Sequence, residues 1–266
     1  MIDASTRAKL DRHIITAQAL RYRTLAKGAF EIRPDWLRGF SNLSIPTFNI
    51  FQPLTPAGLS DDLLADTAAY FASKNTLYAI EIVHDRMPHA PDYLDQRRYQ
   101  PLPPQPAMFL RNFRVRTEFE LNSVVYVERV QTVPALTAMC TLQQRVFDFP
   151  LADMVKLFPV IQLNGENKKI IRHYLAFVDE QPVAAGTAIC VEDVVSIWNV
   201  CTSDQYRDRR VATTLVHQML CEANDAHCHL AMLYSTPQAY HLFTKLGFEI
   251  FTQRQWFLPP GLDYQD

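Results

Sequence analysis

The sequence predicts a mixed α/β (α+β) protein that is built of two halves. Three observations support this prediction. Of the 266 residues, 48% are hydrophobic and 20% are charged, which is ample apolar material for a buried core. In both halves, runs of β-branched and aromatic residues alternate with segments whose apolar residues recur at helical spacing. A proline-rich stretch at 101–106 favours turns and extended backbone near the end of the first half. We therefore expect two domains, 1–116 and 117–266.

The second half shows a regular order of expected elements. A strand is expected at 124–127, followed by a helix at 134–147 in which Pro134 suits the first turn. The runs 174–178 and 183–190 predict a hairpin whose turn contains Asp179 and Pro182. Then follow a strand at 194–200, a helix from Val211 to about Ala223, a strand at 230–234, a helix at 237–246 that Gly247 ends, and a strand at 248–251. From residue 174 onward the predicted order is β-β-β-α-β-α-β.

The first half repeats this order less clearly. A leading helix at 5–25 has an apolar side that should pack and a basic side that should face solvent. After it we expect a strand at 44–51, a helix at 59–74 with Ser60 as N-cap, a strand at 77–83, a short helix at 91–98 and a strand at 107–110.

Bulk charge and cysteine usage limit the possible partners. A formal net charge of -2 gives no general attraction to nucleic acid or to anionic membranes. Neither a signal peptide nor a run of about 18 apolar residues is apparent. Five cysteines, an odd number without CxxC spacing, are typical of reduced thiols. We expect a cytoplasmic protein without nucleic-acid or membrane partners, and the sequence leaves its oligomeric state open.

One group of possible metal ligands lies in the second half. His217 and Cys221 would share a helix face at i,i+4, and the triplet His227-Cys228-His229 follows. This spacing matches none of the usual zinc motifs. We therefore expect core or surface residues here and no metal.

The stretch QYRDRRVATTLV, residues 205–216, places three arginines and one aspartate directly before an apolar helical run. A helix start presents unpaired backbone N–H groups and the positive end of the helix dipole, so it suits an anion such as pyrophosphate. Arginine side chains add charge-assisted hydrogen bonds. A solvated turn and a contact to a nucleic-acid backbone are the other interpretations of the residues alone, and the charge balance argues against the second.

The pattern Arg207-x-x-Arg210-x-Ala212, the helix after it and the later run 239–248 resemble the GNAT superfamily of acyl-CoA-dependent N-acyltransferases. The resemblance spans about residues 122–258. It implies two GNAT-like halves, each a mixed, mostly antiparallel sheet flanked by helices. The first half resembles a degenerate copy, because residues 54–58 replace the phosphate-binding turn, and we expect it to shape structure or substrate without a cofactor.

The resemblance also implies where acetyl-CoA would bind. Its pyrophosphate would lie on the arginine-rich turn and the helix start, and the backbone of a splayed strand would hold the acyl carbonyl and the pantetheine arm. The residues implied are Val200, Cys201, Thr202, Arg207, Asp208, Arg209, Arg210, Val211, Ala212 and Thr213.

Two departures from the family pattern bear on catalysis. Arg210 stands where the family usually has its first glycine, so its side chain must point away from the phosphates or contact them. Phe243 stands where many members carry the tyrosine that protonates the departing thiolate. Tyr240 and Tyr234 are the candidate replacements, unless water protonates the thiolate.

The amine must lose a proton to become a nucleophile, and the resemblance implies a carboxylate near the strands before the turn. Glu192 is the nearest candidate, with Asp193 beside it and Glu166 in the preceding loop, although Glu192 and Asp193 also fit a plain hairpin turn. Cys201 has no histidine at a spacing that indicates nucleophilic catalysis, and direct transfer needs none.

These residues together predict an N-acetyltransferase that moves an acetyl or other acyl group from acetyl-CoA to a primary amine of a small molecule or a protein. The alternative is an acyl-CoA-binding sensor or scaffold with weakened catalysis. The phenylalanine at 243 favours this alternative.

Overall fold

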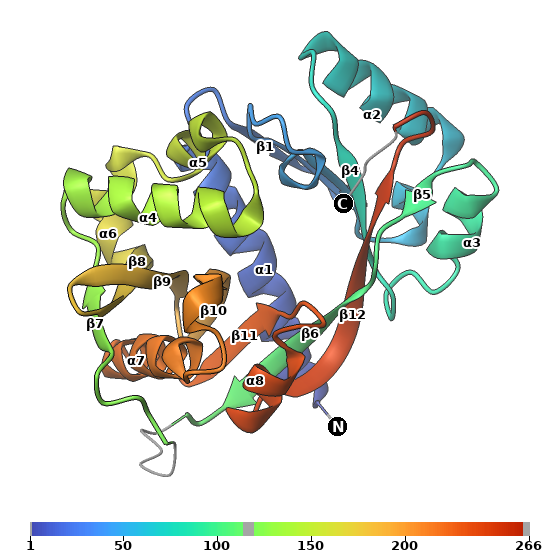
Figure 1. The fold of residues 1–266 in the computed structure, drawn as a ribbon. Coiled ribbons are helices and arrows are strands. Elements are labelled where there is room, and N and C mark those ends of the chain that lie inside the picture. Colours follow the sequence, from blue (N-terminus) through green and yellow to red (C-terminus); the bar gives the residue numbers. More distant parts are fainter. Residues whose placement is uncertain (1, 114–119, 263–266) are drawn as a thin grey trace. The chain divides into compact units, whose positions relative to one another are not determined.

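The computed structural model describes residues 2–113 and 120–262, which form two compact units (Figure 1). Unit 1 consists of Met1–Ala17 and Met108–Phe251, and unit 2 of Gln18–Ala107 and Thr252–Asp266. The predicted boundary between residues 116 and 117 lies outside the described residues. The chain passes from one compact unit to the other at 17/18, 107/108 and 251/252.

Six strands form the sheet of unit 1, and most of their pairing is antiparallel, as predicted. The neighbours from β7 to β10 run antiparallel, and β10 and β11 run parallel. In spatial order the strands are β7 (Tyr126–Arg129), β8 (Ile171–Val178), β9 (Gln181–Val191), β10 (Val194–Thr202), β11 (Leu230–Tyr234) and β6 (Gln105–Arg111).

Helices cover both faces of this sheet. α7 (Val211–Asp225) and α8 (Tyr240–Lys245) pack on one face, and α4 (Val133–Phe147) lies on the other (Figure 1). Because both faces are covered, β8, β9 and β10 carry long apolar runs instead of a polar alternation. Two shorter helices, α5 (Leu151–Leu157) and α6 (Asn167–Ile170), connect α4 to β8.

The first part of α1 (Ala4–Thr24) belongs to unit 1 and packs on the face opposite α7. Its Leu10 and Ile14 are buried against Val194 and Leu230. Since alternate residues of a strand face opposite sides, Val194 meets α1 while Val195 meets the α7 core. A segment far away in sequence thus completes the core of unit 1.

Unit 2 contains the remainder of α1 and strands of its own. Its core includes Phe51, Phe71 and Ile80, and the Ser60 hydroxyl caps α2 by accepting a hydrogen bond from Leu63 N at 3.3 Å. The predicted N-cap is therefore confirmed. The elements are β1 (Ala29–Ile32), β2 (Trp36–Phe40), β3 (Ile50–Pro53), α2 (Asp61–Ser73), β4 (Ala79–Val83), α3 (Ala90–Asp95), β5 (Gln100–Pro101) and most of β12 (Glu249–Leu258), whose first residues up to Phe251 belong to unit 1.

The two halves of the chain repeat one topology. The series β1-β2-β3-α2-β4 has the same pairing as β8-β9-β10-α7-β11, namely two antiparallel neighbours and then a parallel one. The final strand of each half is exchanged. β6 follows α3 in sequence but lies beside β11, and β12 follows α8 but pairs antiparallel with β4.

Some elements differ from the sequence-based expectation. β1 and β2 are not predicted, because they are only four and five residues long and β2 contains Gly39. The strand expected at 44–51 begins only at Ile50, since Pro46–Phe48 form a 3-10 turn. The helix expected at 237–246 begins at Tyr240, and Gly247 follows it with a φ of 88° as predicted for a helix-ending glycine.

Candidate active site

β10 and β11 separate after four paired residues. Their parallel pairing runs from Val194 opposite Leu230 to Ile197 opposite Leu233. β10 then continues to Thr202, and in the described part of the chain only β9 pairs with this extension. One edge of residues 198–202 therefore has no strand partner. The resemblance leads us to expect a splayed strand in this part of the chain.

A β-bulge accounts for the separation. The register between β9 and β10 shifts between Trp198 and Cys201, and Asn199 has a φ of 52°. A bulge bends the strand that carries it and re-aims its end. Val200, Cys201 and Thr202, three of the predicted binding residues, form this bent end.

Buried acceptor atoms without partners lie along this bent end. Gln143 of α4 donates from Nε2 to Asn199 O at 3.3 Å, while its Oε1 is buried with no hydrogen-bond partner among the described residues. Thr202 Oγ1 is likewise buried and unpaired within that part of the chain. Unpaired buried acceptors are costly, so they favour a ligand that supplies N–H donors. Gln143 is not predicted from the sequence, where it is one polar residue in an amphipathic helix.

The start of α7 has backbone N–H groups that no side chain caps. Arg210 is the N-cap, and its side chain makes no capping bond. The first helical bond runs from Thr214 N to Arg210 O at 3.0 Å, so the N–H groups of Val211, Ala212 and Thr213 lack intrahelical partners. No acidic residue lies in this first turn. Free N–H groups at a helix start favour an anion, which is the kind of ligand that the sequence leads us to expect here.

The equivalent helix of the first half differs in this respect. At α2, Ser60 caps an N–H group, and Asp61 and Asp62 occupy the first turn. Two carboxylates at a helix start disfavour a further anion there. Of the two equivalent helices, α7 is therefore the one whose start has features that favour an anion.

The three arginines of the turn all have partners in this chain. Arg207 pairs with Asp204 at 2.8 Å, Arg210 forms an ion pair with Glu120, and Arg209 lies over the ring of Tyr206 at 5.5 Å. Arg207 and Arg210 keep side-chain exposures of 56% and 57%, so solvent and ligands can reach them.

Arg210 stands at the glycine position of the family pattern and has a backbone conformation that glycine adopts readily. Arg210 has a φ of 58°, and Asp208 two residues earlier has a φ of 60°. Both residues adopt the left-handed conformation, which costs a non-glycine residue roughly 1 kcal/mol. The backbone of the turn thus keeps a conformation typical of glycine, and the arginine side chain adds a guanidinium group.

Tyr234 and Tyr240 occupy different places. Tyr234 ends β11 and lies edge-on to Trp198 of β10, with ring centroids 6.1 Å apart, at the point where the two strands separate. Tyr240 begins α8, next to His241. Phe243 is only 4% exposed and packs against Phe248, so it is a core residue.

The structure does not bring the predicted carboxylates to the separated strands. Glu192 lies in the turn between β9 and β10, six residues before Trp198, which corresponds to about 20 Å along a strand. Asp193 pairs with Lys9 at 2.6 Å, and exposed Glu166 pairs with Lys169 at 2.8 Å. Sequence proximity to β10 favoured Glu192, but it lies at the wrong end of that strand.

A buried polar chain along β10 is not predicted from the sequence. His13 Nε2 of α1 lies 2.8 Å from Ser196 Oγ, which also accepts a hydrogen bond from Trp198 Nε1 at 2.7 Å. Burial lowers the pKa of His13 to about 4. Its position between Leu10 and Ala17 at helical spacing is the signal that places His13 on the packed face.

Cys201 and the His217–Cys221 pair lack the features of a nucleophile or a metal centre. Burial raises the pKa of Cys201 to about 12, so its thiol stays protonated. Cys221 Sγ lies 3.6 Å from His217 Nδ1 on α7, and no group of three or more potential ligands is found among the described residues.

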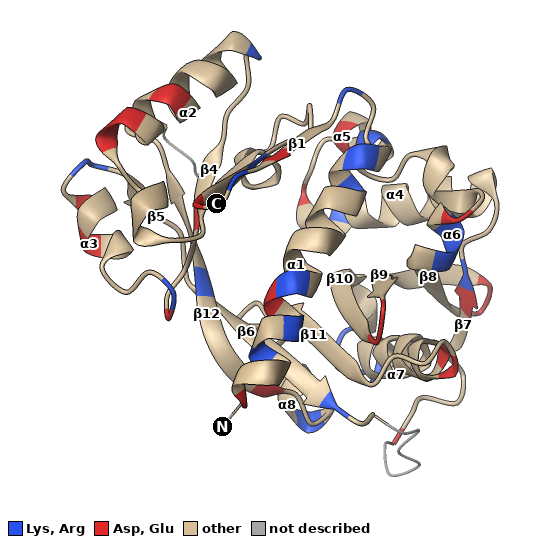
Figure 2. Ribbon diagram, turned by 180° about the vertical axis from the view of Figure 1, so that it is seen from behind, with Lys and Arg blue, Asp and Glu red and all other residues tan. Residues whose placement is uncertain are grey.

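Helix α1 carries both basic and acidic side chains. Figure 2 shows its basic positions together with an acidic one, and Arg7 and Asp11 form an ion pair at 3.0 Å. No helix within residues 2–113 and 120–262 has both the length and the apolar content for a bilayer crossing.

Part of the chain matches a known domain family, and its fold resembles solved structures. Residues 169–250 match the family model described as the acetyltransferase (GNAT) domain. No curated protein matches the chain. Among solved structures, a GCN5-related N-acetyltransferase from Kribbella flavida has 15% identity and a TM-score of 0.72, covering 94% of this chain and 95% of that one.

Two further solved structures share the fold. A GCN5-related N-acetyltransferase from Sphaerobacter thermophilus has 11% identity and a TM-score of 0.66, with 88% of this chain and 84% of that one covered. A tandem GNAT protein from the clavulanic acid biosynthesis pathway has 9% identity and a TM-score of 0.62, with coverages of 92% and 86%. At these identities the structures show the fold.

Residues 169–250 thus match the acetyltransferase (GNAT) domain. The chain as a whole shares its fold with solved GCN5-related N-acetyltransferases.

Proposed function

We propose that this protein is an N-acyltransferase that moves an acyl group, most simply acetyl, from acyl-CoA to a primary amine of a small molecule or a protein. The observation that carries the proposal is the separation of β10 from β11 next to a helix start with free N–H groups. The absence of disulfides among the five cysteines fits a reducing compartment, and we place the protein in the cytoplasm.

The binding roles follow from the groups present. The N–H groups of Val211, Ala212 and Thr213 receive the pyrophosphate, with Arg207 and Arg210 adding charge from the turn. Gln143 Oε1 and Thr202 Oγ1 accept hydrogen bonds from amide N–H groups of the pantetheine arm. These contacts aim the thioester at the point where the strands separate.

The chemistry is a direct transfer. The amine nitrogen attacks the thioester carbonyl carbon, a C–N bond forms, the C–S bond breaks, and the thiolate leaves. Tyr234 is the better placed proton donor for the thiolate, because it lies where the strands separate. Tyr240, at the start of α8, is the second candidate. With Glu192 at the far end of β10, the amine enters as the free base or loses its proton to water.

Binding of acetyl-CoA and thiol release with a panel of amines test this function. Calorimetry should give micromolar binding of acetyl-CoA and CoA, and thiol release should rise with at least one class of amine. Binding without turnover for every amine favours the sensor or scaffold instead. No binding of either ligand to well-folded protein removes the proposal.

A charge placed at the helix start tests the binding site itself. Ala212→Asp puts a carboxylate in the first turn of α7, where it stabilises the helix but repels pyrophosphate. We expect at least a tenfold weaker affinity for CoA without a lower melting temperature. Ala212→Ser is the matched neutral control. Equal affinities of both variants would place the anion elsewhere.

A further inference from the structure

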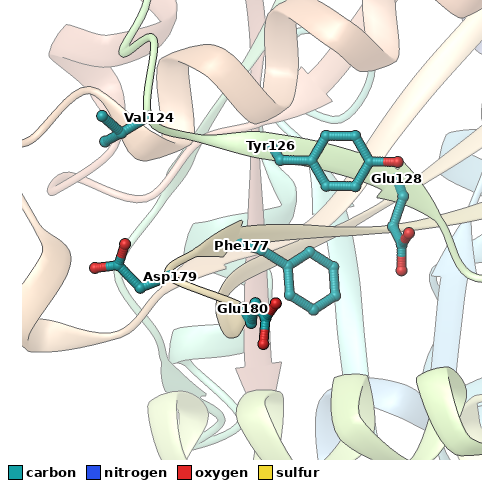
Figure 3. A pocket seen from close by; sticks show the side chains of 6 residues that line it. All are labelled: Val124, Tyr126, Glu128, Phe177, Asp179 and Glu180. Atoms are coloured by element: carbon teal, nitrogen blue, oxygen red, sulfur yellow. The ribbon is translucent and has the colours of Figure 1, made fainter.

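The described residues form a hollow on the β7–β8 edge of unit 1. Its volume is about 320 Å³, and the side chains that line it are labelled in Figure 3: Val124, Tyr126, Glu128, Phe177, Asp179 and Glu180. Tyr126 pairs with Phe177 across the two strands, so both point to one face, and Glu128 follows on that face. Val127 and Val178 pack toward α7, which puts the hollow on the opposite face.

An aromatic pair forms one wall of the hollow. The rings of Tyr126 and Phe177 have centroids 6.5 Å apart, and Tyr126 is 63% exposed. Val124 next to them is also largely exposed. Apolar side chains that gather in a hollow and remain this exposed are typical of a contact surface. They are not needed for the packing of the core. Ring faces in addition attract cations.

Three carboxylates surround this apolar wall. Glu128 comes from β7, and Asp179 and Glu180 form the turn between β8 and β9 (Figure 3). Within residues 2–113 and 120–262 the carboxylates of these three residues form no ion pair or hydrogen bond. A positive charge placed among them would be attracted to all three.

The hollow lies apart from the candidate active site. β8 and β9 separate β7 from β10, so three strand spacings, about 14 Å, lie between them. Its volume is near the lower end for small-molecule pockets. The apolar wall suits carbon chains, and a metal ion would instead require a closer set of oxygen ligands.

We propose that this hollow binds a small organic cation that carries an aliphatic segment, of the diamine or triamine class. The aliphatic segment lies against Tyr126 and Phe177, and the ammonium groups contact Glu128, Asp179 and Glu180. This binding does not require acyl transfer, so it stands or falls separately from the proposed function.

Calorimetry or NMR titration of the full chain with 1,5-diaminopentane tests the proposal. Pentane-1,5-diol is the matched neutral probe. We expect saturable diamine binding that weakens with added salt, and no diol binding at the same concentration. Absence of diamine binding at millimolar concentration overturns the proposal, as does equal binding of the diol.

Variants locate the site. The triple variant Glu128→Gln, Asp179→Asn and Glu180→Gln should weaken diamine binding at least tenfold, and Phe177→Leu several-fold. Asp179→Asn alone serves if the triple variant does not fold. Glu249 is an exposed acid at the start of β12 in the same unit, so Glu249→Gln is the matched control and should bind like the wild type.

Unchanged affinity in the charge variants contradicts the proposal. So does a lysine-rich peptide that binds tenfold more tightly than the diamine and depends on the same residues, because the face would then dock a protein.

Discussion

Arg210 at the start of α7 is ion-paired with Glu120, which lies in the segment that leads to β7. The carboxylate thus competes for the guanidinium that replaces a glycine in the anion-binding turn. Both side chains are more than half exposed, so the pair itself adds little to stability. Its effect should appear in ligand binding.

Glu120→Gln should strengthen the binding of CoA. The substitution frees Arg210 for the pyrophosphate and removes a negative charge from the turn, and exposed ion pairs of this kind are worth up to about 1 kcal/mol. We expect a roughly two- to fivefold lower Kd by calorimetry. Asp225→Asn, at the opposite end of α7, should change it little. Weaker binding in Glu120→Gln would instead assign Glu120 to the ligand contact.

The left-handed backbone at position 210 predicts an unusual order of stability. Arg210→Gly should be more stable than Arg210→Ala by about 1 kcal/mol, because only glycine adopts a φ of 58° without strain. The same pair at Thr213, inside the helix, should show the reverse order, with glycine about 1 kcal/mol less stable than alanine. Urea denaturation measures both differences, and the same order at both positions contradicts the assigned backbone.

Buried His13 predicts a loss of stability in acid. Burial lowers the pKa of His13 from 6.5 to about 4, so the unfolded chain binds a proton between these values while the folded chain does not. Stability is therefore complete above the unfolded pKa and falls as the pH drops below 6.5. Between pH 7.5 and pH 5 the group should cost about 2 kcal/mol.

Denaturation of His13→Gln at the two pH values isolates this effect. The amide keeps a polar contact for Ser196 and does not titrate, so the variant should lose about 2 kcal/mol less than the wild type on acidification. Parallel losses in both proteins would show that His13 is already solvated in the fold.

The exchanged strands predict that the halves do not fold separately. Residues 117–266 alone lack β6 and the packed part of α1, so Leu230 and Val194 lose the buried contact with Leu10. We expect an insoluble or partly folded fragment. Two fragments cut between 116 and 117 and produced together should assemble into a soluble pair. Circular dichroism and size-exclusion chromatography of the lone fragment provide the check, and a cooperative, monomeric fragment would rule the expectation out.

Local patterns predicted the elements that carry strong chemical signals. Ser60 before an amphipathic run, Pro134 in a first turn and Gly247 after a helix each lie where the structure needs them. The arginine-rich turn and the bent end of β10 likewise lie side by side in sequence, so a local motif identified both.

Contacts between distant segments could not be predicted in this way. Gln143 meets Asn199 across 56 residues, and His13 meets Ser196 across 183. Glu192 is close to β10 in sequence, but it lies before the start of that strand, away from the end that separates from β11. The hollow at Tyr126 combines β7 with the β8–β9 turn, and its residues carry no motif.

The position of β12 has a consequence for synthesis. β4 is translated about 170 residues before its partner strand β12. One edge of β4 therefore stays unpaired until β12 has been synthesised. An unpaired edge of this kind invites wrong pairing with other nascent chains. Chaperone capture during translation should therefore begin once β4 has left the exit tunnel and end only when the last strand has emerged.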